Sequence, residues 1–251
     1  MIHLAARTFR DLLYPERCIG CGAFGEIACS RCLARLHEQD RPSRCKNCSA
    51  RWDGEDNCPR CYAWDALDGA FSAHEMEGMA RKMIHGLKYN YIESLAALLA
   101  EDIALLLKQD VADSTDKKVP ASAVGAGLLP AFAVPLHPAR LKQRGFNQAE
   151  LILDATGWAR GEGHLRRIRK TESQVGKRAR DRVRNVGGAF AYNGPSLKGV
   201  TVVLIDDVIT TGATANECAR TLKDHGAQSV WGVAFARASH DPAKPGSPIA
   251  D

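Results

Sequence analysis

The residues best suited to chemistry form one unbroken stretch, 202–214, which reads Val-Val-Leu-Ile-Asp-Asp-Val-Ile-Thr-Thr-Gly-Ala-Thr. Four apolar residues that favour β-structure lead into two adjacent carboxylates, and a loop of small residues then enters a helical segment at Ala215. Backbone N–H groups and threonine hydroxyls in such a loop suit a phosphate monoester, and carboxylates accept hydrogen bonds from sugar hydroxyls. We therefore predict one site for a ribose and its 5′-phosphate. The alternative is that Asp206 and Asp207 only end a strand and start a turn, although acids are costly to bury for that purpose alone.

The same stretch resembles, position by position, the phosphoribosyl pyrophosphate (PRPP) signature of type I phosphoribosyltransferases. It differs from a Walker loop, because no Gly-Lys-Ser/Thr follows the phosphate turn. The resemblance implies Mg²⁺ as the ion that joins pyrophosphate and ribose oxygens. It also implies a catalytic role for the two acids and a PRPP-binding set made of Asp206, Asp207, Thr210, Thr211, Gly212, Ala213 and Thr214.

Length and composition are those of a globular protein. The 251 residues can form one large domain or two modest ones, with 45% apolar and 25% charged residues. Apolar runs are shorter than the roughly 18–20 residues that span a bilayer, and the first residues lack the apolar core of a signal peptide. We expect a cytoplasmic protein without membrane insertion.

Eight of the nine cysteines form four C-x-x-C pairs, which predict metal binding. Two such turns supply the four thiolates of one tetrahedral zinc site, and short intervening loops favour sequential pairing. The result is two closed, structural Zn²⁺ sites: Cys18, Cys21, Cys29 and Cys32 in the first, and Cys45, Cys48, Cys58 and Cys61 in the second. A single zinc and redox-active pairs are the alternatives, whereas disulfides fit poorly with a cytoplasmic chain.

A first cationic segment contains Arg140, Lys142 and Arg144. It follows a short strand, 128–136, at the edge where open α/β sheets bind ligands, so we predict a loop that binds pyrophosphate. Resemblance to type I enzymes implies the same role. The alternative for Arg144 is an ion pair with Glu150 at the start of the helix that follows.

A second cationic segment, the basic strip, runs from residue 166 to residue 184 and holds nine Arg or Lys against two acids. Such a local excess indicates a polyanionic ligand. The strip occupies the place of the mobile loop of type I enzymes, which implies a lid with Arg178 and Arg182 as candidate contacts. The alternative is a solvated face of a basic helix.

The remaining pattern predicts alternating helices and strands. Apolar residues at helical spacing over 75–108 indicate two helices with a break near Asn90-Tyr91, and another helix is expected over about 147–159. A strand over 200–206, a helix ending before Gly226 and a strand over 229–236 form one βαβ unit.

The order of these motifs resembles the ComF family, amidophosphoribosyltransferase-like proteins of bacterial competence and DNA utilisation. The resemblance rests on the cysteine pairs, Leu87-Lys88-Tyr89, Arg-Gly-Phe-Asn-Gln at 144–148, a Thr-x-x-Gln element at 171–174 and the PRPP signature, and covers about residues 15–238. The stretch 109–127 is longer than the family pattern. The family implies an α/β fold with a type I phosphoribosyltransferase-like parallel sheet, flanking helices and a small N-terminal zinc-ribbon module. We expect a double zinc ribbon over 15–65, a phosphoribosyltransferase-like domain over 66–238 and a disordered tail over 239–251.

Two functions of different classes fit these residues. The first is a ComF-type protein that binds PRPP with Mg²⁺ and acts as a phosphoribosyltransferase on an acceptor that the sequence does not name. The second is a non-catalytic protein of the competence machinery that binds single-stranded DNA, contacts DNA-uptake proteins and uses the PRPP-type site as a phosphate sensor. In this second case Trp52, Tyr62 and Trp64 could stack on bases, unless they pack the ribbon instead.

Overall fold

A computed structural model describes residues 15–38, 44–45, 47–52, 58–59, 61–62, 64–113, 128–169 and 187–238. Three expectations fall outside these residues. They are the tail over 239–251, the Thr-x-x-Gln element, and the part of the basic strip that holds Arg178 and Arg182.

A four-stranded parallel sheet forms the centre of the protein, in the order β1-β6-β5-β2. Its strands are β1 (Gly69–Glu75), β2 (Ala131–Ala133), β5 (Thr201–Ile209) and β6 (Ser229–Arg237). In the register, Ile205 of β5 lies between Ala133 of β2 and Val233 of β6. Parallel neighbours need crossover connections, which the helices provide. The predicted α/β class is confirmed.

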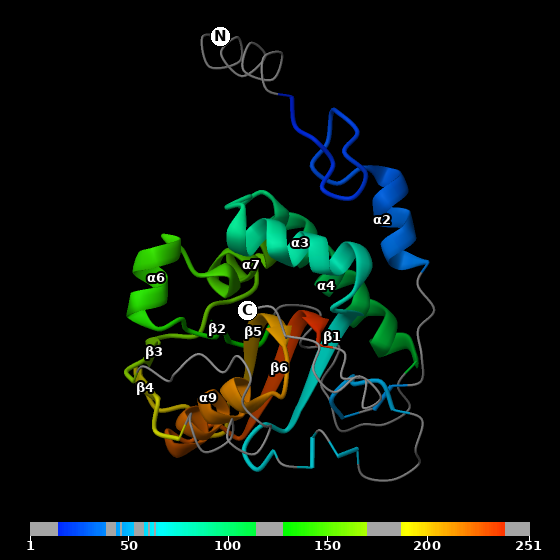
Figure 1. Ribbon diagram of the computed structural model, residues 1–251. Helices are drawn as coiled ribbons and strands as arrows, with labels where there is room; N and C mark the ends of the chain where they lie inside the picture. Colours follow the sequence, from blue (N-terminus) through cyan, green and yellow to red (C-terminus); the bar gives the residue numbers. More distant parts are fainter. Residues whose placement is uncertain are drawn as a thin grey trace.

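Helices cover both faces of the sheet, as Figure 1 shows. One face packs against α3 (Gly78–Tyr89), α4 (Leu95–Asp113) and α7 (Gln148–Thr156), and the other against α9 (Ala213–Asp224). The division follows from the alternation of side chains along β5. Val203 and Ile205 belong to the buried cluster of α3, α4 and α7, whereas Val202 and Leu204 belong to that of α9.

Three smaller elements complete the described fold. A two-stranded antiparallel sheet of β3 (His164–Arg167) and β4 (Phe190–Asn193) packs on the α9 side. The short helix α6 (Pro138–Arg144) follows β2, and α2 (Ser30–His37) begins directly after Cys29.

The predicted pair of helices with a break near Asn90 and the predicted βαβ unit are both confirmed. Four details differ from the sequence predictions. Strand β5 continues to Ile209, so Asp207, which lay just beyond the predicted strand, is inside it together with Asp206. Strand β2 is only three residues long within the expected 128–136, the cationic loop is the helix α6, and β1 was not predicted.

Candidate functional site

The two acids of the PRPP-like stretch lie near the carboxyl end of β5 and have different neighbours. The Asp207 carboxylate is buried, and its Oδ2 lies 2.9 Å from Nζ of Lys88 at the end of α3. Asp206 is half-buried, and its Oδ1 accepts a hydrogen bond of 2.9 Å from the backbone N–H of Asp207. Two carboxylates are therefore held at a strand end where one lysine partly balances their charge.

Asp206 is strongly perturbed. Burial raises its pKa to about 8, the neighbouring charge of Asp207 raises it as well, and the charge of Lys88 acts in the opposite direction. Two adjacent carboxylates cannot both ionise easily in a poorly hydrated position. Near neutral pH the ligand-free site thus carries a proton on Asp206, which a cation or a pair of sugar hydroxyls could replace.

Lys88 is a site residue that the sequence analysis left without a role. The Leu87-Lys88-Tyr89 element appeared there only as part of a family pattern. In the structure Leu87 is fully buried, Lys88 pairs with Asp207, and the Tyr89 ring lies 5.5 Å from the guanidinium carbon of Arg144. One helix end thus touches both the acids and the cationic helix α6.

The phosphate-loop candidate begins directly after β5 and leads directly into α9. Gly212 is the N-cap residue of α9 and has a φ of 77°, which favours glycine. The Thr211 hydroxyl accepts a hydrogen bond of 3.3 Å from the Ala213 N–H, and Thr210 and Thr214 are half-buried. The loop therefore presents its N–H groups and hydroxyls at the N-terminus of a twelve-residue helix. Such a position is suitable for an anion.

An arginine of β3 interacts electrostatically with Asp206 and with a second arginine, which lies on α6. Burial lowers the pKa of Arg167 in β3, the positive charge of Arg140 lowers it further, and Asp206 acts in the opposite direction. These three side chains are therefore close enough to interact electrostatically. Arg140 lies on α6, so Arg167, the second residue of the basic strip, lies near part of the predicted pyrophosphate segment.

The other members of the cationic segment have separate partners. Nη1 of Arg144 donates to Oε1 of the buried Gln148 over 3.1 Å. The alternative pairing of Arg144 with Glu150 is wrong, because Oε2 of Glu150 lies 2.7 Å from Nη1 of Arg160. Lys142 is exposed on α6.

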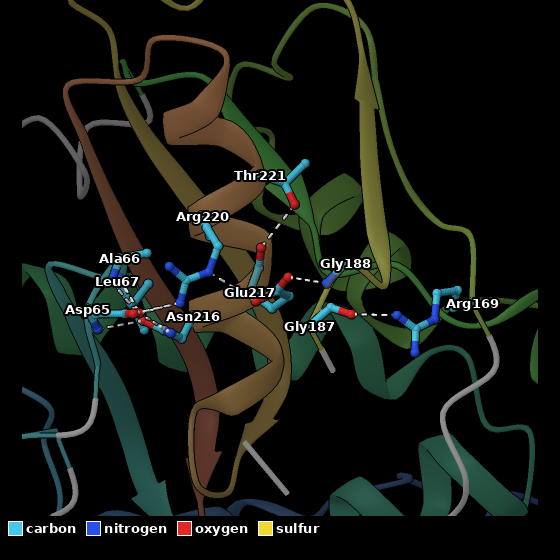
Figure 2. A network of polar contacts seen from close by, with 10 residues as sticks. All are labelled: Asp65, Ala66, Leu67, Arg169, Gly187, Gly188, Asn216, Glu217, Arg220 and Thr221. Atoms are coloured by element: carbon cyan, nitrogen blue, oxygen red, sulfur yellow. Dashed lines mark hydrogen bonds and ion pairs between the residues drawn. The ribbon is translucent and has the colours of Figure 1, made fainter. Parts of the chain in front are cut away.

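A polar network behind the loop joins it to the cysteine-rich part of the chain (Figure 2). Oδ1 of Asn216 in α9 accepts hydrogen bonds from the backbone N–H groups of Asp65, Ala66 and Leu67, at 2.9 to 3.2 Å. Arg220 adds a bidentate pair to the Asp65 carboxylate, at 2.6 and 2.7 Å. The segment after the last cysteine pair is thereby fixed to the helix that carries the loop.

The same helix also contacts the chain just after the basic strip. Oε1 of Glu217 accepts a hydrogen bond of 2.6 Å from the Gly188 N–H, and Nη1 of Arg169 donates to the Gly187 carbonyl over 2.7 Å. Figure 2 shows these contacts on the opposite side of α9 from Asp65. Helix α9 therefore lies between the connector of the cysteine module and Gly188, which follows the basic strip.

The cysteines gather as the predicted sequential pairing requires. Cys18, Cys21, Cys29 and Cys32 form one group, the first ribbon, and Cys45, Cys48, Cys58 and Cys61 form another, the second ribbon. The Sγ–Sγ separations are 3.7 Å for Cys21–Cys29, 3.7 Å for Cys45–Cys61 and 3.8 Å for Cys48–Cys58. A disulfide needs about 2.05 Å, whereas tetrahedral zinc with Zn–S bonds of about 2.3 Å separates its sulfurs by roughly 3.8 Å. The two four-cysteine groups thus fit structural zinc.

The two ribbons contact different parts of the sheet domain. In the first, Lys82 of α3 donates to the Gly20 carbonyl over 2.7 Å, and Cys18 belongs to the buried cluster of α3 and α4. In the second, the Asn47 carbonyl accepts from the Ala70 N–H of β1 over 2.8 Å, so the ribbon covers this edge strand. Cys218, the ninth cysteine, is fully buried in α9, as expected of a packing residue.

No helix among the residues described is long and apolar enough to cross a membrane.

Family models match two parts of the chain. A double zinc ribbon domain matches residues 9–62, and a phosphoribosyl transferase domain matches residues 165–248. The first match contains all eight paired cysteines, and the second contains β5, the loop and α9. The sequence prediction of these two parts is confirmed.

Several relatives align with longer stretches of the chain than either family model does. The DNA utilization protein YhgH of Salmonella typhi is 32% identical over 212 residues, which cover 80% of this chain and 86% of that protein. The YhgH protein of Salmonella typhimurium is 33% identical over 152 residues, 59% of this chain and 63% of that protein. This second alignment covers less than two thirds of the relative. The competence protein ComFC of Streptococcus pneumoniae is 27% identical over 236 residues, 88% of this chain and 100% of that protein.

Proposed function

Because the chain belongs to the ComF family of competence and DNA utilisation proteins, we propose that it binds PRPP with Mg²⁺ at the carboxyl end of β5 and transfers the phosphoribosyl group. One observation carries the proposal. The buried, lysine-paired acid of this strand is followed within seven residues by a threonine-rich loop that caps a helix. In open α/β sheets, ligands bind at this edge of the sheet.

Each part of PRPP has a matching group in the proposed site. The loop from Thr210 to Thr214 takes the 5′-phosphate through backbone N–H groups and hydroxyls. Asp206 and Asp207 accept hydrogen bonds from the ribose hydroxyls and hold Mg²⁺ indirectly, and the ion would neutralise pyrophosphate charge. Arg167 interacts electrostatically with both Asp206 and Arg140, and the two arginines are suited to the leaving pyrophosphate.

The reaction requires positioning and charge compensation more than covalent help from the protein. Departure of pyrophosphate from C1 leaves an oxocarbenium-like sugar, as in glycoside chemistry. Carboxylates beside the ribose stabilise this positive charge, and arginines stabilise the leaving group. The basic strip, in which Arg169 is held to Gly187 just beyond it, would close over the bound polyanion with Arg178 and Arg182.

Calorimetric titration with PRPP and Mg²⁺ tests binding, and an acceptor screen for pyrophosphate release tests transfer. We expect one PRPP per chain, with binding weakened when Mg²⁺ is omitted. Protein that retains its zinc but takes up no PRPP would contradict the site assignment. Binding without pyrophosphate release for any base, amine or nucleotide acceptor would leave a PRPP-binding protein without transferase activity.

A second candidate function, binding of single-stranded DNA, is favoured by exposed aromatic rings in the ribbons. The Tyr62 side chain is 78% exposed, and Phe24 is 61% exposed with Arg17 lying 3.9 Å from its ring centroid. Such rings suit base stacking beside cationic groups. Trp64 is less suitable, because its indole packs against Gly212. Binding of an oligonucleotide that weakens steeply with salt and weakens again in Tyr62→Ala would support this function.

A further inference from the structure

Two histidines and an aspartate meet at the junction between the first ribbon and the sheet domain. His37 is the last residue of α2, His74 lies in β1 and Asp102 lies in α4. Nε2 of His37 is 2.8 Å from Oδ1 of Asp102, and Nε2 of His74 is 3.0 Å from Oδ2 of the same carboxylate. Figure 1 shows α2, α4 and β1 meeting on one side of the molecule. The three residues are far apart in sequence, so only the fold assembles them.

The donor atoms of these side chains have the types and spacing of a metal site. One ring nitrogen of each histidine and a carboxylate oxygen of Asp102 all lie within 4.8 Å of one another. A tetrahedral zinc with ligand bonds of about 2.0–2.2 Å separates its ligand atoms by roughly 3.4 Å. In this group the donor atoms are separated by at least 2.8 Å and by no more than 4.8 Å, so the separation that zinc requires lies within their range. Two imidazoles and one carboxylate are a common ligand set for divalent transition metals.

We propose that His37, His74 and Asp102 bind a third metal ion, a divalent transition metal for which zinc is the natural candidate, separate from the ions of the two ribbons. The three protein ligands leave a fourth position for water, unlike the closed four-cysteine sites. The ion fastens α2 to β1 and α4, so the first ribbon is attached to the sheet domain by a metal as well as by packing.

The surroundings of Asp102 favour a cation at this position. Asp102 is 7% exposed and His74 is 8% exposed, and the His74 ring lies 5.0 Å from the ring of Phe235. Leu36, one residue before His37, is buried in the same hydrophobic cluster as Phe235. A buried carboxylate needs compensating charge as well as hydrogen bonds. The two imidazoles hydrogen-bond to this carboxylate, and a divalent ion held by all three side chains would supply compensating charge as well.

The exposure of His37 provides an entry path for the ion. Its side chain is 46% exposed, whereas that of Asp102 is 8% exposed. An ion with a water ligand on this side should exchange with chelators faster than ions enclosed by four thiolates. This difference separates the third site from the ribbons in an experiment that needs no ligand at the PRPP site.

Elemental analysis of the full chain, saturated with zinc and then desalted, tests the proposal. We expect three zinc ions per chain in the natural sequence and two in His37→Gln, which changes an exposed side chain and should leave the fold intact. Asp102→Asn should also hold two. His164→Gln, an exposed histidine in β3 outside any cysteine or histidine cluster of the described residues, is the matched control and should hold three.

A second measurement uses cobalt in place of zinc. Thiolate sites give an intense sulfur-to-cobalt charge-transfer band, which a nitrogen and oxygen site lacks, so a third cobalt should bind without increasing this band. Two metal ions per chain at saturation, or three that persist in both His37→Gln and Asp102→Asn, would overturn the proposal. The cluster would then be a hydrogen-bonded link between α2, β1 and α4.

Discussion

The indole nitrogen of Trp64 donates a hydrogen bond of 3.0 Å to the carbonyl oxygen of Thr211, which joins the end of the second ribbon to the phosphate-loop candidate across 147 residues of sequence. The indole also fills the space beside Gly212, where a Cβ atom would lie 2.4 Å from the ring. On its other side, Trp64 lies 5.5 Å from the guanidinium carbon of Arg237, whose Nη1 donates to the Cys48 carbonyl over 2.7 Å. A continuous set of contacts therefore connects a zinc-ligand residue to the loop.

Trp64→Phe should weaken PRPP binding without loss of zinc. The ring still packs, but the hydrogen bond to Thr211 is lost, which is worth about 0.5–1.5 kcal/mol and thus roughly a twofold to tenfold change in affinity. Calorimetry and elemental analysis measure the two quantities. Trp158→Phe, half-buried beyond the end of α7, is the control and should leave both unchanged. Equal PRPP affinities in the two variants would show that Trp64 does not position the loop.

The two ribbons should differ in their influence on PRPP binding. Cys48→Ser should remove one zinc and weaken PRPP binding, because the Cys48 carbonyl supports Arg237 and, through it, Trp64. Cys21→Ser should also remove one zinc but retain PRPP affinity, since the first ribbon contacts α3 instead. Zinc content and PRPP affinity are measured on the same preparations. A similar loss of affinity in both variants would indicate general destabilisation rather than this specific connection.

The sequence predicted what lies close together along the chain. Strand β5, the loop, α9 and β6 are contiguous, so their alternation and small-residue turn were sufficient for the βαβ unit. Lys88 and Trp64 were not recognised as site residues, because their partners lie more than a hundred positions away. None of the eight histidines is paired with another at metal-binding spacing along the sequence, yet β1 and α2 bring two of them to Asp102. Strand β1 itself, Gly-Ala-Phe-Ser-Ala-His-Glu, has too few large apolar residues to be predicted.

Asp206→Asn should make the ligand-free protein more stable than the natural sequence, by an amount that increases as pH rises. The folded protein holds a proton on Asp206 up to about pH 8, whereas the unfolded chain releases it near 3.8. Folded protein therefore binds more protons between these values, and the contribution of Asp206 to stability is present below about pH 4 and lost by about pH 8. Urea unfolding should show that the free energy of unfolding decreases less from pH 5 to pH 8 in the variant than in the natural sequence. The same decrease in both proteins would contradict the raised pKa.

Lys88→Met should destabilise the ligand-free protein at pH 8 by roughly 3 kcal/mol, because it leaves the buried Asp207 without its cation. Lys88→Met combined with Asp207→Asn should recover most of this loss, since no unpaired charge remains. Arg81→Met, an exposed position on the same helix, is the control and should have little effect. Urea unfolding of the four proteins gives the coupling energy. Additive effects of the two substitutions would show that the ion pair does not contribute.

The Asp206→Asn/Asp207→Asn variant should abolish PRPP binding while the fold is retained. Amides donate as well as accept, and two charges that hold Mg²⁺ are removed. Each lost charged hydrogen bond is worth roughly 1.5–3 kcal/mol, so the affinity should fall well over tenfold. Calorimetry measures the affinity, and circular dichroism checks the fold. Unchanged affinity in a folded variant would remove these acids from the proposed site.

The basic strip separates the two candidate functions most directly. Arg178→Gln with Arg182→Gln removes two positive charges from it, and Arg81→Gln with Lys198→Gln removes two exposed charges elsewhere as a matched control. If the strip is a lid, pyrophosphate release should fall in the first variant only, and DNA affinity should hardly change. If it follows a nucleic-acid backbone, the slope of log affinity against log salt should flatten by about 0.7 for each lost phosphate contact on a single strand. PRPP binding would then persist, because Asp206, Asp207 and the threonine loop are unchanged.

We expect both properties to change in part, because a lid that closes over a polyanion attracts any phosphate-rich ligand. If neither property differs from the control, the strip is a solvated face and both roles are wrong.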